Sequence, residues 1–252
     1  MPLDVSGTDA LLALVALAAG TVDAIAGGGG LLTLPALLAA GLPPHLALGT
    51  NKGQSVFGAA AALVRFSHAG LVPLKRARWT FPLGFLGSLL GAWLVLQVHP
   101  DVLRPVVLML LVAAAAFVLL RPPVGGGRPA SAAVAPAAAL AFGAGAYDGF
   151  FGPGTGTLLI VGLAGLLTLP LQQASAEAKA INFASNLAGA LLFAARGTVV
   201  WHTALPMAAG QLVGGWVGAH LTVRGGERVV RWVVVCVTGA LVVRLSFDVL
   251  RR

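Results

Sequence analysis

Two lysines and two aspartates lie inside apolar stretches of this chain, where a charged side chain needs a partner or a function. Lys52 and Lys179 are two of its three lysines, and Asp23 and Asp148 are two of its eight acidic residues. A charge near the centre of a bilayer costs at least about 2.5 kcal/mol on insertion scales. These residues therefore predict buried ion pairs, a site at which lysines bind an anion, or both at different stages of a cycle.

Each of these aspartates is followed by a glycine cluster that should break its helix. Glycine loses the most backbone entropy on ordering, and proline has no N–H group. A half-helix that begins after such a break presents unpaired N–H groups and the positive end of its dipole, which bind anions. The candidate residues are Gly27, Gly28, Gly29 and Gly30 after Asp23, and Gly152, Pro153, Gly154, Thr155 and Gly156 after Asp148.

Side-chain amides accompany both lysines. Asn51 adjoins Lys52, whereas Asn182 follows Lys179 by three residues, about one helical turn, and Asn186 lies about one turn further on. The predicted site is therefore asymmetric. We expect the lysines, amides, aspartates and glycine clusters to surround a small anionic substrate.

The arrangement of acid, glycine cluster and lysine occurs twice. The interval from Asp23 to Asp148 is nearly the same as the interval from Lys52 to Lys179, and each is about half of the chain. Matching charges and helix breaks in two halves of a membrane protein indicate a transport site. We predict a first repeat at 1–121, a flexible linker rich in glycine and proline at 122–130, and a second repeat at 131–252.

The composition predicts an integral membrane protein. Hydrophobic residues make up 58% of the chain and charged residues 10%, and the mean hydropathy is +0.93. Apolar runs of about 20 residues, enough to cross a bilayer, recur throughout. The full-length segments are predicted at 45–66, 79–98, 102–120, 174–195, 203–223 and 229–250.

Two further apolar stretches, 11–42 and 132–170, are too long for one crossing and contain the glycine clusters. Each is predicted to be two half-helices in a re-entrant hairpin whose break faces the protein interior, because unpaired backbone groups cannot face lipid. Each repeat then contains one hairpin and three crossings. Because the number of crossings is odd, the second repeat has the opposite orientation in the membrane. The predicted fold is an all-α polytopic membrane protein with two inverted repeats and about eight helical segments, two of them broken hairpins.

Other function classes find no support in the sequence. The net charge of +8 sits in short loops between apolar runs, which indicates orientation in a membrane rather than a nucleic-acid partner. The five histidines and the single cysteine show no metal-ligand spacing. The glycine clusters are not followed by the Gly-Lys-Ser/Thr motif of a nucleotide-binding loop. We therefore predict no catalytic, metal or cofactor site. The predicted partners are a small anion and the lipid bilayer, and an oligomer is allowed.

Three segments resemble a known family: TVDAIAGGGGLLTLPALLAAGLPPHLALGTNK at 21–52, YDGFFGPGTG at 147–156 and AKAINFASN at 178–186. They are similar to the TauE/SafE family of sulfite-exporter-like permeases, and most of all to its branch of probable membrane transporters. The resemblance covers both repeats. It implies a multi-pass carrier in the bacterial inner (cell) membrane for sulfite, thiosulfate, sulfoacetate or other organosulfonates.

The expected function is therefore movement of a small anion by alternating access of the two repeats. Two alternatives stay open. An anion channel would have the same pore lining but would carry ohmic current instead of saturable exchange. A membrane subunit that only docks a partner would keep its role after both lysines were replaced.

Basic residues concentrate in the loop at 65–78, in the linker and near Arg224, which predicts that these three regions are cytoplasmic. Arg251 and Arg252 depart from this pattern, because the inverted repeat places them outside.

Single cysteines introduced in a Cys236→Ala background should report this topology. Probes at Lys75 and Gly126 are expected to label from the cytoplasm, and probes at Asp101 and Gly197 from outside. The measurement is labelling by a membrane-impermeant thiol reagent, in intact cells for the outer positions and after permeabilisation for the cytoplasmic ones. Finding positions 101 and 197 on opposite sides would contradict the inverted repeat.

Overall fold

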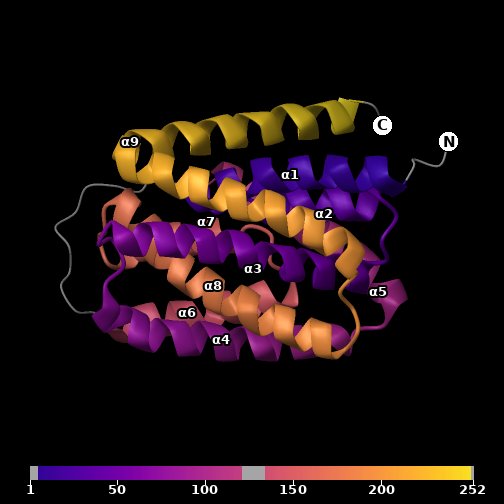
Figure 1. Cartoon of the computed structure of the whole chain (residues 1–252), viewed down its shortest axis with the longest axis horizontal. Coiled ribbons are helices and arrows are strands. Elements are labelled where there is room, and N and C mark those ends of the chain that lie inside the picture. Colours follow the sequence, from indigo (N-terminus) through magenta and orange to yellow (C-terminus); the bar gives the residue numbers. More distant parts are fainter. Residues whose placement is uncertain (1–4, 121–133, 251–252) are drawn as a thin grey trace.

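The computed structural model describes residues 5–120 and 134–250, with side chains at 7–117 and 134–225, and every element in this part of the chain is a helix (Figure 1). The helices are α1 (Val5–Ala26), α2 (Gly30–Ala39), α3 (Pro44–His68), α4 (Leu74–Leu96), α5 (Pro100–Leu120), α6 (Val134–Phe150), α7 (Thr155–Leu166), α8 (Leu171–Ala195) and α9 (Trp201–Leu250). The all-α prediction is confirmed. The predicted linker and the C-terminal arginines lie outside the described residues.

The outer surface of the bundle is apolar. Large side chains such as Leu14, Met109 and Leu205 are 56–66% exposed. Four helices in the described ranges are long and apolar enough to cross a membrane: Gly7–Ala26, Leu74–Leu96, Pro100–Phe117 and Leu171–Ala195. An apolar outside around charged groups inside suits lipid as the solvent. The prediction of a polytopic membrane protein is confirmed.

Both predicted helix breaks are present, and each separates two limbs of a hairpin. In Figure 1, α1 and α2 extend from the end of the bundle that holds the N-terminus, whereas α6 begins at the opposite end. The return limbs α2 and α7 have 10 and 12 residues, too few to cross a bilayer. The first limb, α1, has 22 residues and is longer than the expected half-helix. It begins at Val5, before the predicted apolar stretch, and ends at the glycine cluster.

Two further boundaries differ from the sequence prediction. Helix α4 begins at Leu74, directly after Pro73, because the basic residues interpreted as a loop form its first turns. The two segments expected at 203–223 and 229–250 form one continuous helix, α9. Figure 1 shows that α9 doubles back on itself, so helical hydrogen bonding continues through the connection.

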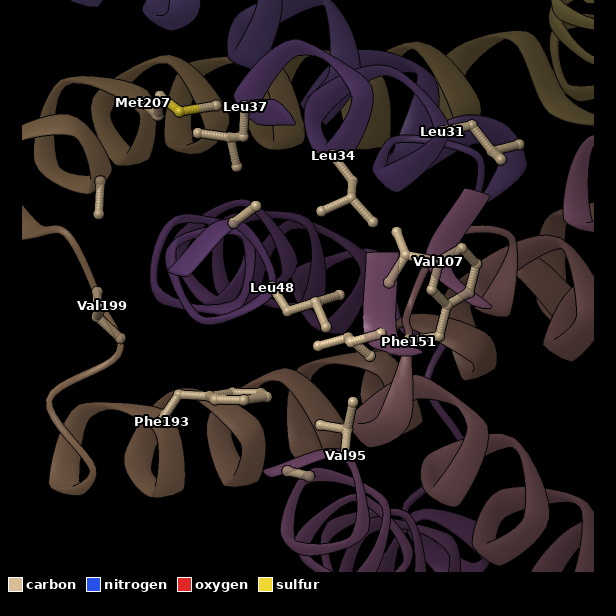
Figure 2. Close-up of a cluster of buried hydrophobic side chains, with 14 of the residues drawn as sticks. Leu31, Leu34, Leu37, Leu48, Val95, Val107, Phe151, Phe193, Val199 and Met207 are labelled. Atoms are coloured by element: carbon tan, nitrogen blue, oxygen red, sulfur yellow. The ribbon is translucent and has the colours of Figure 1, made fainter. Parts of the chain in front are cut away.

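The short helix α2 is anchored in a hydrophobic core. Figure 2 shows Leu31, Leu34 and Leu37 of α2 pointing toward Leu48 of α3 and toward Phe151 at the second break. All five side chains are at most 4% exposed. This packing keeps α2 inside the protein, so its unpaired N-terminal backbone does not face lipid.

Glycines allow the long helices to approach at matching places in the two halves. Gly87 and Gly91 of α4 lie directly on the backbone of α6, and Gly214 and Gly218 of α9 lie on the backbone of α1. The two glycine pairs are separated by the same interval as the two buried lysines. Such small-xxx-small packing is common between membrane helices. The inverted repeat itself stays a prediction.

A glycine-to-alanine substitution should distinguish glycines that pack against another helix from glycines that do not. A Cβ atom at Gly91 would overlap the backbone of Ala146, whereas one at Gly143 of α6 would meet no atom within 4 Å. We expect Gly91→Ala to destabilise the protein by about 1–3 kcal/mol, because the overlap forces α4 from α6. The control Gly143→Ala should be neutral or stabilising, since alanine favours helix. Thermal unfolding in detergent measures both, and equal melting temperatures would contradict the packing role.

Candidate functional site

The tips of the two hairpins meet in the interior of the bundle. The backbone N–H of Thr157 donates to Gly27 O at 3.2 Å, and its hydroxyl donates to Ala26 O at 2.8 Å. A Cβ atom at Gly27 or at Gly156 would overlap the backbone of the other. Gly27 also has a φ of +79°, which L side chains rarely adopt. The crossing therefore requires glycine at both positions.

Two ion pairs join the halves of the chain at this crossing. Lys52 Nζ of α3 lies 2.8 Å from Asp148 Oδ1 of α6, and Lys179 Nζ of α8 lies 2.5 Å from Asp23 Oδ2 of α1. Each lysine thus pairs with the aspartate of the other half. Three of the four side chains are 1–3% exposed, and Asp23 is 21% exposed.

The Lys52 pair is held tightly on all sides. Lys52 Nζ also donates to Asn186 Oδ1 at 3.3 Å, and Ser185 Oγ donates to Asp148 Oδ2 at 2.5 Å. The lysine stem packs on Gly189 of α8, where a Cβ atom would lie 3.2 Å from the lysine Cδ. These contacts supply the hydrogen bonds that a buried ion pair needs.

The Lys179 pair also has two further partners, one of them a backbone amide. Lys179 Nζ donates to Asn182 Oδ1 at 3.3 Å as well as to Asp23. The other oxygen of Asp23, Oδ1, accepts the backbone N–H of Gly29 at 3.2 Å. The carboxylate therefore links the lysine of α8 to the glycine break after its own helix.

These groups surround a small polar cavity of about 20 Å³. A cavity of this size holds about one water molecule. The charges of these groups sum to zero, because each lysine forms an ion pair with one aspartate. The lining residues are Asp23, Gly27, Gly29, Gly30, Asn51, Lys52, Ser55, Asp148, Gly152, Gly156, Asn182, Asn186 and Gln211.

Most of the predicted site residues therefore come together. Lys179 is not among the lining residues but contacts Asp23 and Asn182, which are. Asn51 lines the cavity, and its Oδ1 accepts the hydroxyl of Thr33 at 2.6 Å, which ties α3 to α2.

Four predicted residues do not line the cavity and instead shape the breaks: Gly28, Pro153, Gly154 and Thr155. Thr155 Oγ1 donates to Gly152 O at 2.6 Å, and Pro153 O accepts the Tyr147 hydroxyl at 2.8 Å. Gly154 precedes α7 with a φ of +86°, a conformation that favours glycine.

Sequence reasoning missed Ser55, Gln211 and Ser185. Ser55 precedes Asn182 by the same interval that separates the two buried lysines, so the repeat spacing could have identified it. Ser185 follows Asn182 by one helical turn and faces the same side of α8. Gln211 lies in an apolar stretch, and no spacing distinguishes it from a packing residue.

The cavity also contains free backbone donors. Gly30 and Gly156 lie at the first turns of α2 and α7, where N–H groups have no intrahelical acceptor. Among the described residues, neither amide donates to another group. Both residues line the cavity. Two helix N-termini, two ammonium groups and several amides give it the chemistry to bind an oxyanion once the carboxylates move away.

Another buried carboxylate, that of Glu177 of α8, does not belong to the cavity. Arg76 in the first turn of α4 donates to both of its oxygens, from Nε at 2.9 Å and from Nη2. Gln173 Nε2 adds a bond at 3.3 Å. This ion pair ties α4 to α8.

The chain is similar to known membrane proteins over nearly its whole length. Residues 12–245 match the family model described as sulfite exporter TauE/SafE. The probable membrane transporter protein YfcA of Escherichia coli (strain K12) is 39% identical over 240 residues, 94% of this chain and 89% of the relative. A probable membrane transporter protein of Haemophilus influenzae is 36% identical over 242 residues, 95% and 94% of the two chains. No solved structure is significantly similar.

Removing one partner of the Lys52 pair should cost more than removing both. Lys52→Met leaves Asp148 buried without a counter-charge, and Asp148→Asn does the same to Lys52. Each single variant is expected to lose about 3–5 kcal/mol of stability. The double variant should recover most of this loss, because no charge remains buried. The measurement is unfolding in detergent, with Lys75→Met at an exposed position as control. A double variant less stable than either single one would contradict the pairing.

Proposed function

The chain belongs to the TauE/SafE family of sulfite exporters, and we propose that it is a permease for a small anion, either a sulfur oxyanion or an organosulfonate. Sulfite, thiosulfate and sulfoacetate are the expected candidates. The protein is a membrane transporter by family. We place it in the inner (cell) membrane of a bacterium, since its relatives are membrane transporters of bacteria.

One observation carries the proposal: the ammonium group of Lys52 lines a polar cavity inside the bundle, beside two helix N-termini, and that of Lys179 contacts Asp23, which lines the same cavity. An oxyanion must shed water to enter such a place, and only charge and many donors can offset that loss. A single ammonium 4 Å from a negative charge contributes about 4 kcal/mol at an effective dielectric constant of 20. The lysines supply this interaction twice.

The geometry also favours alternating access over an open pore. The cavity holds about one water molecule, so it must widen before an anion fits. Both ion pairs connect the first half of the chain to the second. A rocking motion of one half against the other would separate aspartates from lysines and expose the ammonium groups to an entering anion.

Replacing either lysine should abolish most transport. Lys52→Ala and Lys179→Ala are each expected to lower anion flux at least about a hundredfold, because about 4 kcal/mol of attraction is lost. Lys→Arg should restore little, since a planar guanidinium does not replace a compact ammonium in a confined cavity. The matched control is Lys75→Ala, the third lysine, which is exposed on α4.

The measurement is uptake into proteoliposomes of labelled sulfite, thiosulfate and sulfoacetate, each with and without the same anion on the far side. Saturable uptake that is faster with anion inside indicates a carrier, and ohmic current would indicate a channel. Wild-type flux in both folded alanine variants would contradict the lysine site.

A further inference from the structure

The charges around the cavity already sum to zero before a substrate arrives. Lys52 and Lys179 contribute two positive charges, and Asp23 and Asp148 contribute two negative charges. A transported monoanion would leave one negative charge unbalanced among groups that are largely shielded from water. Such a charge is costly in a low-dielectric site. A positive charge must therefore enter with the anion.

We propose that this charge is a proton, that it binds Asp23, and that anion and proton cross together; the inference rests on the proposed function. The two aspartates are not equivalent as proton acceptors. The Asp23 side chain is 21% exposed, whereas that of Asp148 is 3% exposed. Asp148 also accepts from both Lys52 and Ser185. Asp23 likewise accepts two hydrogen bonds, from Lys179 and from the backbone of Gly29. Its greater exposure therefore makes it the easier of the two for a proton to reach.

The two oxygens of Asp23 have separate partners, which makes protonation a release step. A hydronium ion transfers its proton to Oδ2: an O–H bond of hydronium breaks, one forms on the carboxyl group, and water remains. Oδ2 then no longer holds Lys179 Nζ, 2.5 Å away, by charge. Oδ1 still accepts the N–H of Gly29. The ammonium group of Lys179, with Asn182 beside it, becomes free to bind the anion.

The total charge is then zero both before and after binding. The empty site holds two ammonium groups and two carboxylates; the occupied site holds two ammonium groups, one carboxylate and one monoanion. Neither form leaves a buried charge without a counter-charge. The empty and the loaded protein can therefore both close around the cavity, as alternating access requires.

Among the described residues, the titratable groups near Asp23 at the cavity are Lys179, Lys52 and Asp148. No further titratable side chain lines the cavity and could take the proton instead. Helices α2 and α7, which pack beside α1, contain no titratable residue. The remaining titratable groups on α3, α8 and the described part of α9 do not line the cavity: His45, Arg65, His68, Glu177, His202, His220 and Arg224.

Calorimetry counts the protons directly. The full-length protein in detergent is titrated at pH 7 with methanesulfonate, a monoanion at this pH, in buffers of different ionisation enthalpy. Thiosulfate, a dianion, is titrated as a second test that the site binds an anion at all. We expect the observed heat to vary with buffer in proportion to one proton taken up per methanesulfonate bound. A binding heat that is the same in every buffer would overturn the proposal, because then a cation other than a proton, or none, accompanies the anion.

Variants assign the proton to its residue. Asp23→Asn cannot take up a proton and resembles the protonated carboxyl group, so methanesulfonate should bind with a heat independent of buffer. The control Asp101→Asn changes a side chain that is 90% exposed at the start of α5, and it should keep the wild-type proton count. Proton uptake that persists in Asp23→Asn would overturn the assignment. If neither anion binds the wild-type protein at all, the proposed function fails instead, and the two failures remain distinguishable.

Discussion

The cost of burying charge in a membrane protein constrains the rest of this structure. Four charged side chains meet in its interior, and each is tolerable only with a counter-charge within hydrogen-bond distance. The partners come from opposite halves, so α3 must lie beside the tip of the second hairpin and α8 beside the tip of the first. The crossed ion pairs therefore fix where both hairpins end, and the glycine crossing follows from that placement.

The glycine clusters serve the same site through the backbone. Gly27 and Gly156 touch because neither has a side chain, and the starts of the broken helices, Gly30 and Gly156, line the cavity. Lipid would not tolerate the unpaired amides of a helix start, which is why α2 is buried under leucines and the core residue Phe151 (Figure 2). The hydrophobic core at this end of the bundle thus holds unpaired donors where a ligand can use them.

The repeat spacing made the charged residues and glycine clusters predictable, because burial of charge and helix breaking are properties of residue type. It did not predict that Lys52 pairs with Asp148 and Lys179 with Asp23, since that choice depends on how the halves pack. The start of α4 was predicted too late, because basic residues can form the first turns of a helix. The two limbs of α9 were predicted, but the helical connection between them was not (Figure 1). Gln211 lies at the cavity because of how the helices pack, which the sequence pattern does not show.

The two halves share a framework but differ in the bonds at its ends. Arg76 and Glu177 form a bidentate ion pair between α4 and α8. At the spacing of the two buried lysines, the position in the first half that matches Glu177 is Thr50, whose hydroxyl accepts the N–H of Val200 at 3.0 Å. A charge-assisted bidentate contact is stronger than one neutral hydrogen bond. The contact between α4 and α8 is therefore the stronger of these two, so matching positions in the two halves of the chain are held by unequal bonds.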